Sequence, residues 1–147
     1  MKRFFERRVP HLPKPMFEIV GDLADYPRFI PNCKAMDVRP DPGARGKDVR
    51  LALMTLSFGP ITQAYTSRVT TDHEALTIAA KAVDGPFAYL DSIWTFEPEG
   101  QGTRVRFEID FKISNPLIAA VAEPAFAAKQ DEIMQAFADE ADRRYGA

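Results

Sequence analysis

The chain has 147 residues, of which 46% are hydrophobic and 27% charged, the size and composition of one ordinary domain with its own core. Its formal net charge of -2 supplies no basic field that would draw it non-specifically onto DNA, and no apolar run approaches the roughly 18 residues of a membrane-spanning helix. Cys33 is the only cysteine, so no disulfide forms within the chain, which suits a reducing compartment. We expect a single cytoplasmic domain over residues 1–147.

The N-terminal segment predicts a strand followed by a short helix. Residues 1–9 are basic but lack the apolar core of a signal peptide, so we interpret them as a first strand. Pro13 and Pro15 suit a helix start, and the helix is expected to end near Asp25. Its apolar residues recur at the i, i+3, i+4, i+7 spacing of a one-sided helix: Met16, Ile19, Val20 and Leu23.

The next segment combines prolines with apolar side chains. Pro27 and Pro31 disfavour a regular helix, while Tyr26 and Phe29 supply apolar mass. We interpret it as a compact, non-helical turn that packs on the core. Tyr26 and Phe29 are then a plug over one end of the fold rather than ligand contacts.

Residues 35–111 show the period-two pattern of an antiparallel meander. Its clearest strand comes last, where Val105, Phe107, Ile109 and Phe111 alternate with charged residues, giving one apolar and one solvated face. Turns are expected at Asp41-Pro42-Gly43, Phe58-Gly59-Pro60, Thr71-Asp72-His73, Asp84-Gly85-Pro86 and Glu99-Gly100-Gln101-Gly102.

Residues 117–145 are rich in alanine and other strong helix formers, and they predict a long C-terminal helix. Pro124 is expected to bend this helix or to mark its true start. The apolar run at residues 115–121 predicts either a lid that touches a membrane or ordinary burial of the first helical turn. The charged residues of the last turns are interpreted as a solvated helix end: Asp139, Glu140, Asp142, Arg143 and Arg144.

This order of elements predicts an α+β helix-grip fold, because a curved antiparallel sheet of about seven strands can bury its apolar face by wrapping a long helix. Alanines on the helix, opposite aromatic residues on the strands, either leave a cavity or let the helix pack close to the sheet. A few polar groups among many apolar ones favour a cavity for a small hydrophobic ligand, and these groups include Tyr65, Ser67, Ser92 and Gln130. The residues predicted to line it are Leu51, Leu53, Tyr65, Ser67, Val69, Leu90, Trp94, Phe96, Phe107, Ile109, Phe111, Phe126, Gln130, Ile133 and Phe137.

Three sequence blocks resemble those of a known family. DLADYPRFIPNC at residues 22–33 is similar to the D-x-x-x-Y-x-x-F-[VI]-P-x-C signature of coenzyme Q-binding START-like proteins, in the polyketide cyclase/dehydrase superfamily, and of the closely similar ribosome-association toxins. YTSRV at residues 65–69 resembles the family's Y-x-S-x-V strand, and DGPFAYLDSIWTF at residues 84–96 resembles its D-G-P-F-x-x-L-x-x-x-W-x-F block. The resemblance covers nearly the whole chain.

The resemblance implies a START-like lipid-binding domain that holds ubiquinone or a related isoprenoid lipid. Such a protein serves respiratory electron transport as a carrier or chaperone, without chemistry of its own and without a required cofactor. Its candidate contacts are the inner membrane surface and a respiratory complex. Two alternatives stay open: a toxin or regulator that binds the large ribosomal subunit, and an enzyme of the polyketide cyclase and aromatase type.

Residue patterns typical of catalysis and metal binding are sparse. His11, His73 and Cys33 lack the spacing of metal ligands, and no G-x-S-x-G, P-loop or dinucleotide-binding motif occurs. Carboxylates such as Asp91 and Asp110 fall on alternating strands, so we interpret them as part of a solvated face. The sequence predicts no catalytic residue and no metal site, and it favours a binding protein over an enzyme.

Overall fold

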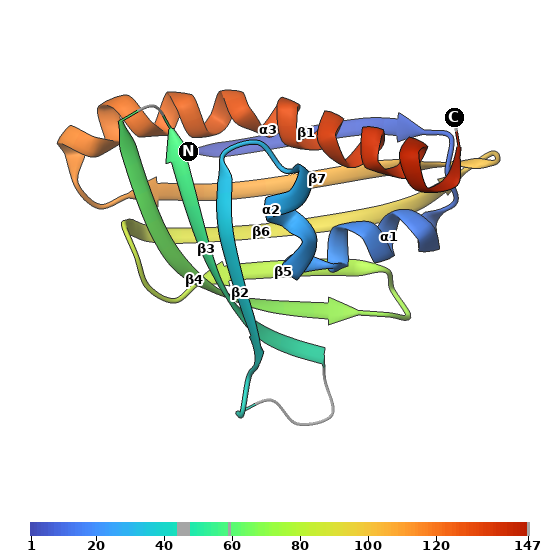
Figure 1. Ribbon diagram of the computed structural model, residues 1–147, viewed down its shortest axis with the longest axis horizontal. Coiled ribbons are helices and arrows are strands. Elements are labelled where there is room, and N and C mark those ends of the chain that lie inside the picture. Colours follow the sequence, from blue (N-terminus) through green and yellow to red (C-terminus); the bar gives the residue numbers. More distant parts are fainter. Residues whose placement is uncertain (44–47, 59, 147) are drawn as a thin grey trace.

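The computed structural model describes residues 1–43, 48–58 and 60–146, and it confirms the α+β helix-grip architecture (Figure 1). A curved sheet wraps the long C-terminal helix, and short helices follow the first strand. The elements in chain order are β1 (Lys2–Val9), α1 (Pro13–Gly21), the 3₁₀ turn η1 (Leu23–Asp25), α2 (Tyr26–Phe29), β2 (Cys33–Pro40), β3 (Asp48–Phe58), β4 (Ile61–Asp72), β5 (Thr77–Ala82), β6 (Phe87–Glu99), β7 (Gly102–Ile113) and α3 (Pro116–Tyr145).

The strands form one antiparallel sheet in the order β1-β7-β6-β5-β4-β3-β2. Strands β2 to β7 each pair with their neighbour in sequence, as a meander requires, and β1 pairs with β7. The β6–β7 hairpin turns at Gly100, whose φ of 62° is a left-handed conformation that glycine adopts readily. The turn predicted at residues 58–60 includes Gly59, which lies outside the described residues.

The β5–β6 turn is pressed against β4. A Cβ added to Gly85, whose φ is 101°, would lie 2.4 Å from the Tyr65 Cβ, so this close approach requires glycine. The Asp84 carboxylate accepts a hydrogen bond of 2.6 Å from the Thr66 N–H. The Asp84-Gly85-Pro86 turn therefore fixes the start of β6 next to Tyr65.

Alternation of apolar and charged residues along β7 gives the sheet a buried face and a solvent-exposed face. Val105, Phe107, Ile109 and Phe111 are buried, while the residues between them are half-exposed or exposed. The buried residues belong to the core, which also contains the apolar side of α1. Concave curvature of this face leaves room for α3 across it.

Helix α3 crosses the concave face and lies against β1 and β7 (Figure 1). Asn115 caps it by accepting hydrogen bonds from the N–H groups of Leu117 and Ile118. The helix continues through Pro124, so this proline does not mark its start. No helix in the described ranges combines the length and hydropathy needed to cross a membrane.

The first turn of α3 is not buried in the ordinary way. Leu117 is 83% exposed and Val121 is 62% exposed. The expectation of simple burial is therefore wrong for these two side chains, and a lid at residues 115–121 stays a prediction.

The segment between α1 and β2 is more helical than the sequence suggested. A 3₁₀ turn passes directly into the single α-helical turn of α2, with Pro27 among its first residues. Proline is tolerated there, because the N–H groups of a first helical turn have no partner within the helix. The expectation of a non-helical turn was wrong for this reason.

Candidate functional site

A cavity of about 120 Å³ lies between α3, the sheet and the segment from η1 to the start of β2. Ligand sites for drug-sized molecules usually enclose roughly 300–1,000 Å³, whereas about 150 Å³ suffices for a single benzene ring. The cavity is thus slightly below the size of a site for one small ring, which fits with a small movement of the walls, and a larger ligand also requires an extension through the rim.

One wall, here called the aromatic side, consists of Trp94, Phe107, Phe126 and Phe137. The rings of Trp94 and Phe107 stack with centroids 4.3 Å apart, and Phe137 meets Trp94 edge-on at 5.3 Å. Such pairs add to the stabilisation that burial of their area provides. Trp94 thus contacts both Phe107 and Phe137, while Phe126 meets Phe111 of the core edge-on at 4.8 Å, so this wall is tightly packed.

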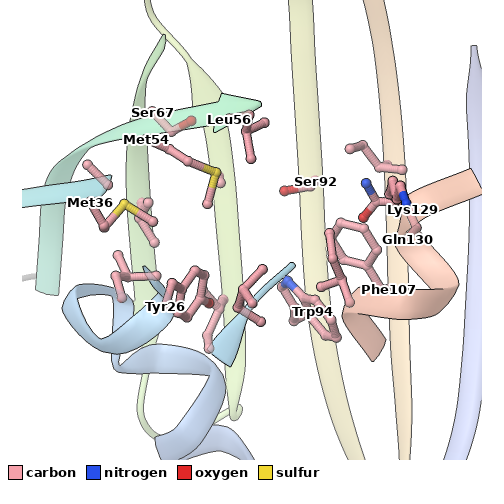
Figure 2. A pocket seen from close by; sticks show the side chains of 18 of the residues that line it. Tyr26, Met36, Met54, Leu56, Ser67, Ser92, Trp94, Phe107, Lys129 and Gln130 are labelled. Atoms are coloured by element: carbon pink, nitrogen blue, oxygen red, sulfur yellow. The ribbon is translucent and has the colours of Figure 1, made fainter. Parts of the chain in front are cut away.

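The opposite wall, here called the small-residue side, consists of Met36, Ala52, Met54, Ser67 and Ala80. Figure 2 shows Met36, Met54 and Tyr26 across the cavity from Trp94, Phe107 and Gln130. Met36 and Met54 are cross-strand partners on β2 and β3. Unbranched methionine side chains change rotamer easily, so this wall can yield when a ligand enters.

The open space comes from the sheet and not from the helix. Among the described lining residues, α3 contributes Phe126, Lys129, Gln130, Ile133 and Phe137, and no alanine. Ala52 and Ala80, by contrast, stand on strands. The helix alanines, which the sequence offered as one possible source of the cavity, are therefore not part of its described lining.

Polar atoms in the cavity differ in how well they are satisfied. The Gln130 Nε2 donates to the Phe126 carbonyl at 3.1 Å, and the Tyr65 hydroxyl contacts the Met54 Sδ at 3.6 Å. Burial raises the pKa of Tyr65, so its phenol stays neutral. Within the described part of the chain, the side chains of Ser67, Ser92 and Trp94 have no hydrogen-bond partner, and their polar atoms are not sealed off by protein.

The α2 wall is formed by Leu23, Tyr26, Ile30 and Pro31. The Tyr26 hydroxyl donates to the Val20 carbonyl, and its ring meets Phe137 at 5.4 Å. Tyr26, expected only as a plug, therefore borders the cavity as well. Phe29 lies outside the lining and packs against Phe137 at 5.6 Å.

An ion cluster ties this α2 wall to the end of α3. The Glu140 carboxylate, 3% exposed, accepts hydrogen bonds from Arg143 and Arg144 at 2.7 Å and from Arg28 of α2. Asp25 in turn pairs with Arg144 at 2.7 Å and with Arg28 at 2.9 Å. The interpretation of Glu140 as part of a solvated helix end was wrong, since three arginines make its burial tolerable.

These arginines also set the titration of the two carboxyls. Hydrogen bonds from Arg143 first, and then from Arg28 and Arg144, hold the pKa of Glu140 far below its ordinary value. The hydrogen bond from Arg28 lowers the pKa of Asp25 in the same way. Both carboxylates are therefore ionised at neutral pH, and the α2 wall is held partly by charge.

The structure brings most of the predicted site residues to the cavity. Its lining includes Tyr65, Ser67, Val69, Trp94, Phe107, Ile109, Phe126, Gln130, Ile133 and Phe137. Leu90, Phe96 and Phe111 are buried in the core but do not border the open space.

Leu51 and Leu53 are placed on the other face of β3, and Leu53 is 42% exposed. Their prediction as lining residues was wrong, because β3 is apolar on both faces and alternation cannot be read from it. The pairing of β3 with β4 shows which face of β3 borders the cavity. Ala52 lies opposite Ser67 and Met54 lies opposite Tyr65, and both partners line the cavity. Ser92, expected among the polar groups of the cavity, lines it as well. The lining residues that the prediction missed are Leu23, Tyr26, Ile30, Pro31, Met36, Ala52, Met54, Leu56, Ile78, Ala80 and Lys129.

The described lining is suited to binding a neutral molecule. Lys129 is its one charged side chain, it pairs with Glu132 at 3.1 Å, and it is 34% exposed at the rim. Among the residues that the structure describes, no three histidine, cysteine or acidic side chains gather as metal ligands would.

Comparison with known proteins gives matches over nearly the whole chain. The family model described as polyketide cyclase/dehydrase and lipid transport matches residues 9–138. The chain is 30% identical over 132 residues to the ribosome association toxin RatA of Rickettsia prowazekii, covering 88% of each. It is 32% identical over 136 residues to the mitochondrial coenzyme Q-binding protein COQ10 of Drosophila melanogaster, covering 89% of this chain and 54% of that protein.

Two solved structures are similar along their length. The 18 kDa protein CC1736 from Caulobacter crescentus has a TM-score of 0.83 and 27% identity, covering 100% of this chain and 99% of that one. The Zhui aromatase/cyclase from Streptomyces sp. R1128 has a TM-score of 0.72 and 17% identity, covering 98% and 96%. At the latter identity, the likeness speaks for the fold alone.

Proposed function

The chain belongs to the polyketide cyclase/dehydrase and lipid transport family, and from this premise we propose that it binds an isoprenoid quinone as a carrier or chaperone. The observation that carries the proposal is the apolar cavity, sized for one ring and bordered by a few polar atoms. Similarity to a protein named for coenzyme Q binding supports the same ligand class.

The size of the cavity divides such a ligand into two parts. A ring fits between the aromatic side and the small-residue side, whereas a long isoprenoid tail exceeds 120 Å³ and must pass the rim near Lys129. Each tail methylene that finds apolar cover contributes about 0.8 kcal/mol. In this arrangement the ring is held inside the protein, and the tail adds affinity along the exit path.

Trp94 offers a direct test, because it is the only tryptophan and it borders the cavity. We expect saturable quenching of its fluorescence by a short-chain ubiquinone, with free tryptophan under the same conditions as the control for collisional quenching. Mass spectrometry of lipids extracted from the purified protein should also detect an isoprenoid quinone. The proposal fails if no quinone copurifies and the quenching matches that of free tryptophan.

A second candidate is binding to the large ribosomal subunit, favoured by the similarity to ribosome association toxin RatA. Co-sedimentation with large subunits at low salt tests it, because electrostatic attraction to RNA is strongest there. Absence of the protein from the ribosomal pellet would remove this candidate. An aromatase or cyclase activity is supported only by the shared fold and by the description of the family, so we do not propose one.

A further inference from the structure

Three polar side chains that border the cavity have no hydrogen-bond partner within the described chain. Trp94 is 9% exposed and Ser67 is 7% exposed, and within the described chain neither has a hydrogen-bond partner. Ser92, which is half-buried, also has no side-chain hydrogen-bond partner within the described chain. Their polar atoms stay accessible from the cavity, so an occupant that displaces water from them without supplying a partner would leave each one unsatisfied at a cost of about 1–3 kcal/mol. An occupant that supplies partners avoids this cost.

Strand geometry brings two of these side chains to one place. Ser92 and Trp94 are two residues apart on β6 and thus face the same side of the sheet. Figure 2 shows the Ser92 hydroxyl and the indole nitrogen of Trp94 directed into the same open space. Ala80 lies opposite Ser92 on β5, and its methyl group is too short to fill that space.

The chemistry of the pair limits what can meet it. The indole N–H only donates, so the ligand atom beside it must be an acceptor. A serine hydroxyl rotates and can donate to the same atom or to a neighbouring one. Around this pair the lining is otherwise mostly apolar, so the acceptor has to be carried by an apolar ring that stacks on the aromatic side.

We propose that Trp94 and Ser92 select a ring that carries a carbonyl oxygen, and that they discriminate against a hydrocarbon ring of the same shape. This inference rests on the proposed function of the cavity and adds the residues that would form hydrogen bonds with the head group of the ligand. Across β5 from Ser92 lies Val69 of β4, and Ser67 is the next residue along β4 on the same face, where it can meet a second oxygen on a ring that spans the small-residue side.

The test compares two probes by isothermal titration calorimetry: a decyl-dimethyl-benzoquinone, and the decyl-dimethylbenzene with the same substituents but no carbonyl oxygens. Ser92→Ala removes only a hydroxyl, and Trp94→Phe removes the N–H while keeping an aromatic ring. Ser57→Ala is the matched control, because Ser57 lies outside the cavity and its hydroxyl pairs with Thr62 at 3.3 Å.

We expect each cavity substitution to weaken binding of the benzoquinone roughly three- to tenfold, the usual worth of one hydrogen bond. Binding of the hydrocarbon should change by less than about twofold, and Ser57→Ala should affect neither probe. Equal losses for both probes would show that the two residues only pack against the ligand, and unchanged benzoquinone binding would show that they do not contact its oxygens. Either result overturns the inference.

Failure of the proposed function is distinguishable from failure of this inference. If the wild-type protein binds the hydrocarbon as tightly as the benzoquinone, the cavity remains a site for apolar rings but carbonyl selection is wrong. If the wild-type protein binds neither probe, quinone binding itself is contradicted together with the selection that depends on it.

Discussion

The aromatic side and the small-residue side of the cavity face each other, and their side chains are packed in different ways. Rings on the aromatic side are fixed by stacking and edge contacts, as between Trp94 and Phe107. The small-residue side has short side chains on its central strands and two methionines near the β2 edge. The difference suggests that one wall positions a ring while the other sets how much space it has. Substitutions on the two sides should therefore have different consequences.

The largest effect is expected in the packed core behind the aromatic side. Phe111 is fully buried and meets Phe126 edge-on at 4.8 Å, so Phe111→Ala should lower the free energy of unfolding by about 3–5 kcal/mol. Met54→Ala, on the small-residue side, should cost only about 1–2 kcal/mol, because Met54 already borders open space and loses fewer contacts. Urea denaturation measures both, and equal losses would contradict the comparison.

The next effect concerns the ion cluster that holds the α2 wall. Glu140→Gln should lower the free energy of unfolding at pH 7 by about 2 kcal/mol, since hydrogen bonds from three arginines lose their charged acceptor. The folded pKa of Glu140 lies below its ordinary value of 4.5, so the wild-type protein keeps this stabilisation above pH 4.5 and loses it as the pH falls toward the folded value.

Urea denaturation at several pH values between neutral and acid compares the stability of the wild type with that of the Glu140→Gln variant. The Gln variant should lose less stability on acidification than the wild type, although Asp25 titrates in the same direction. Arg143→Ala is a second variant for this measurement. Arg143 contacts Glu140 from within α3 and does not bridge to α2, so its substitution tests the pairing inside α3 separately from the link to α2. Parallel pH profiles for the wild type and the Gln variant would contradict the role given to Glu140.

A smaller gain in stability is expected when the cavity is filled. Ala80→Leu places a larger side chain into the open space and should raise the free energy of unfolding by about 1 kcal/mol. The same change should weaken quinone binding at least tenfold, because ring and side chain compete for one volume. Ala79→Leu, on the opposite face of β5, is the control and should leave binding unchanged. If Ala80→Leu binds quinone normally, the ligand lies elsewhere.

The smallest effect should come from the outer face of β3. Leu53→Ser is expected to change the free energy of unfolding by no more than about 0.5 kcal/mol, because Leu53 is 42% exposed. Quinone affinity should also be unaffected. A loss comparable to that of Met54→Ala would show that β3 presents its other face to the cavity.

The sequence predicts an element well where apolar and polar residues alternate clearly. The buried face of β7 follows from its alternation with charged residues, and the order of strands and helices follows from the changes of period. Strand β3 gives no such signal, because Leu51 and Ala52 are both apolar although they face opposite sides. Only the pairing with β4 settles which of them borders the cavity.

Other features of the site depend on contacts between distant segments. Burial of Glu140 requires Arg28, which is 112 positions away, and no local pattern in α3 reveals that partner. The same holds for the α2 wall, where Tyr26 becomes a lining residue only once α3 places Phe137 against it. Local periodicity describes each element, whereas the cavity exists only between elements.

The crowded turn at Gly85 constrains how such a chain can diverge. Any protein that keeps this approach of the β5–β6 turn to β4 needs glycine there, whatever it binds. Gly85 in the DGPF block at residues 84–87 is thus required by chain geometry and says little about the ligand. A change of specificity during evolution would have to occur at positions that face the cavity, such as Met36, Met54, Ala80 and Ser92. There a side chain can be exchanged without the clash between neighbouring strands that a side chain at Gly85 would cause.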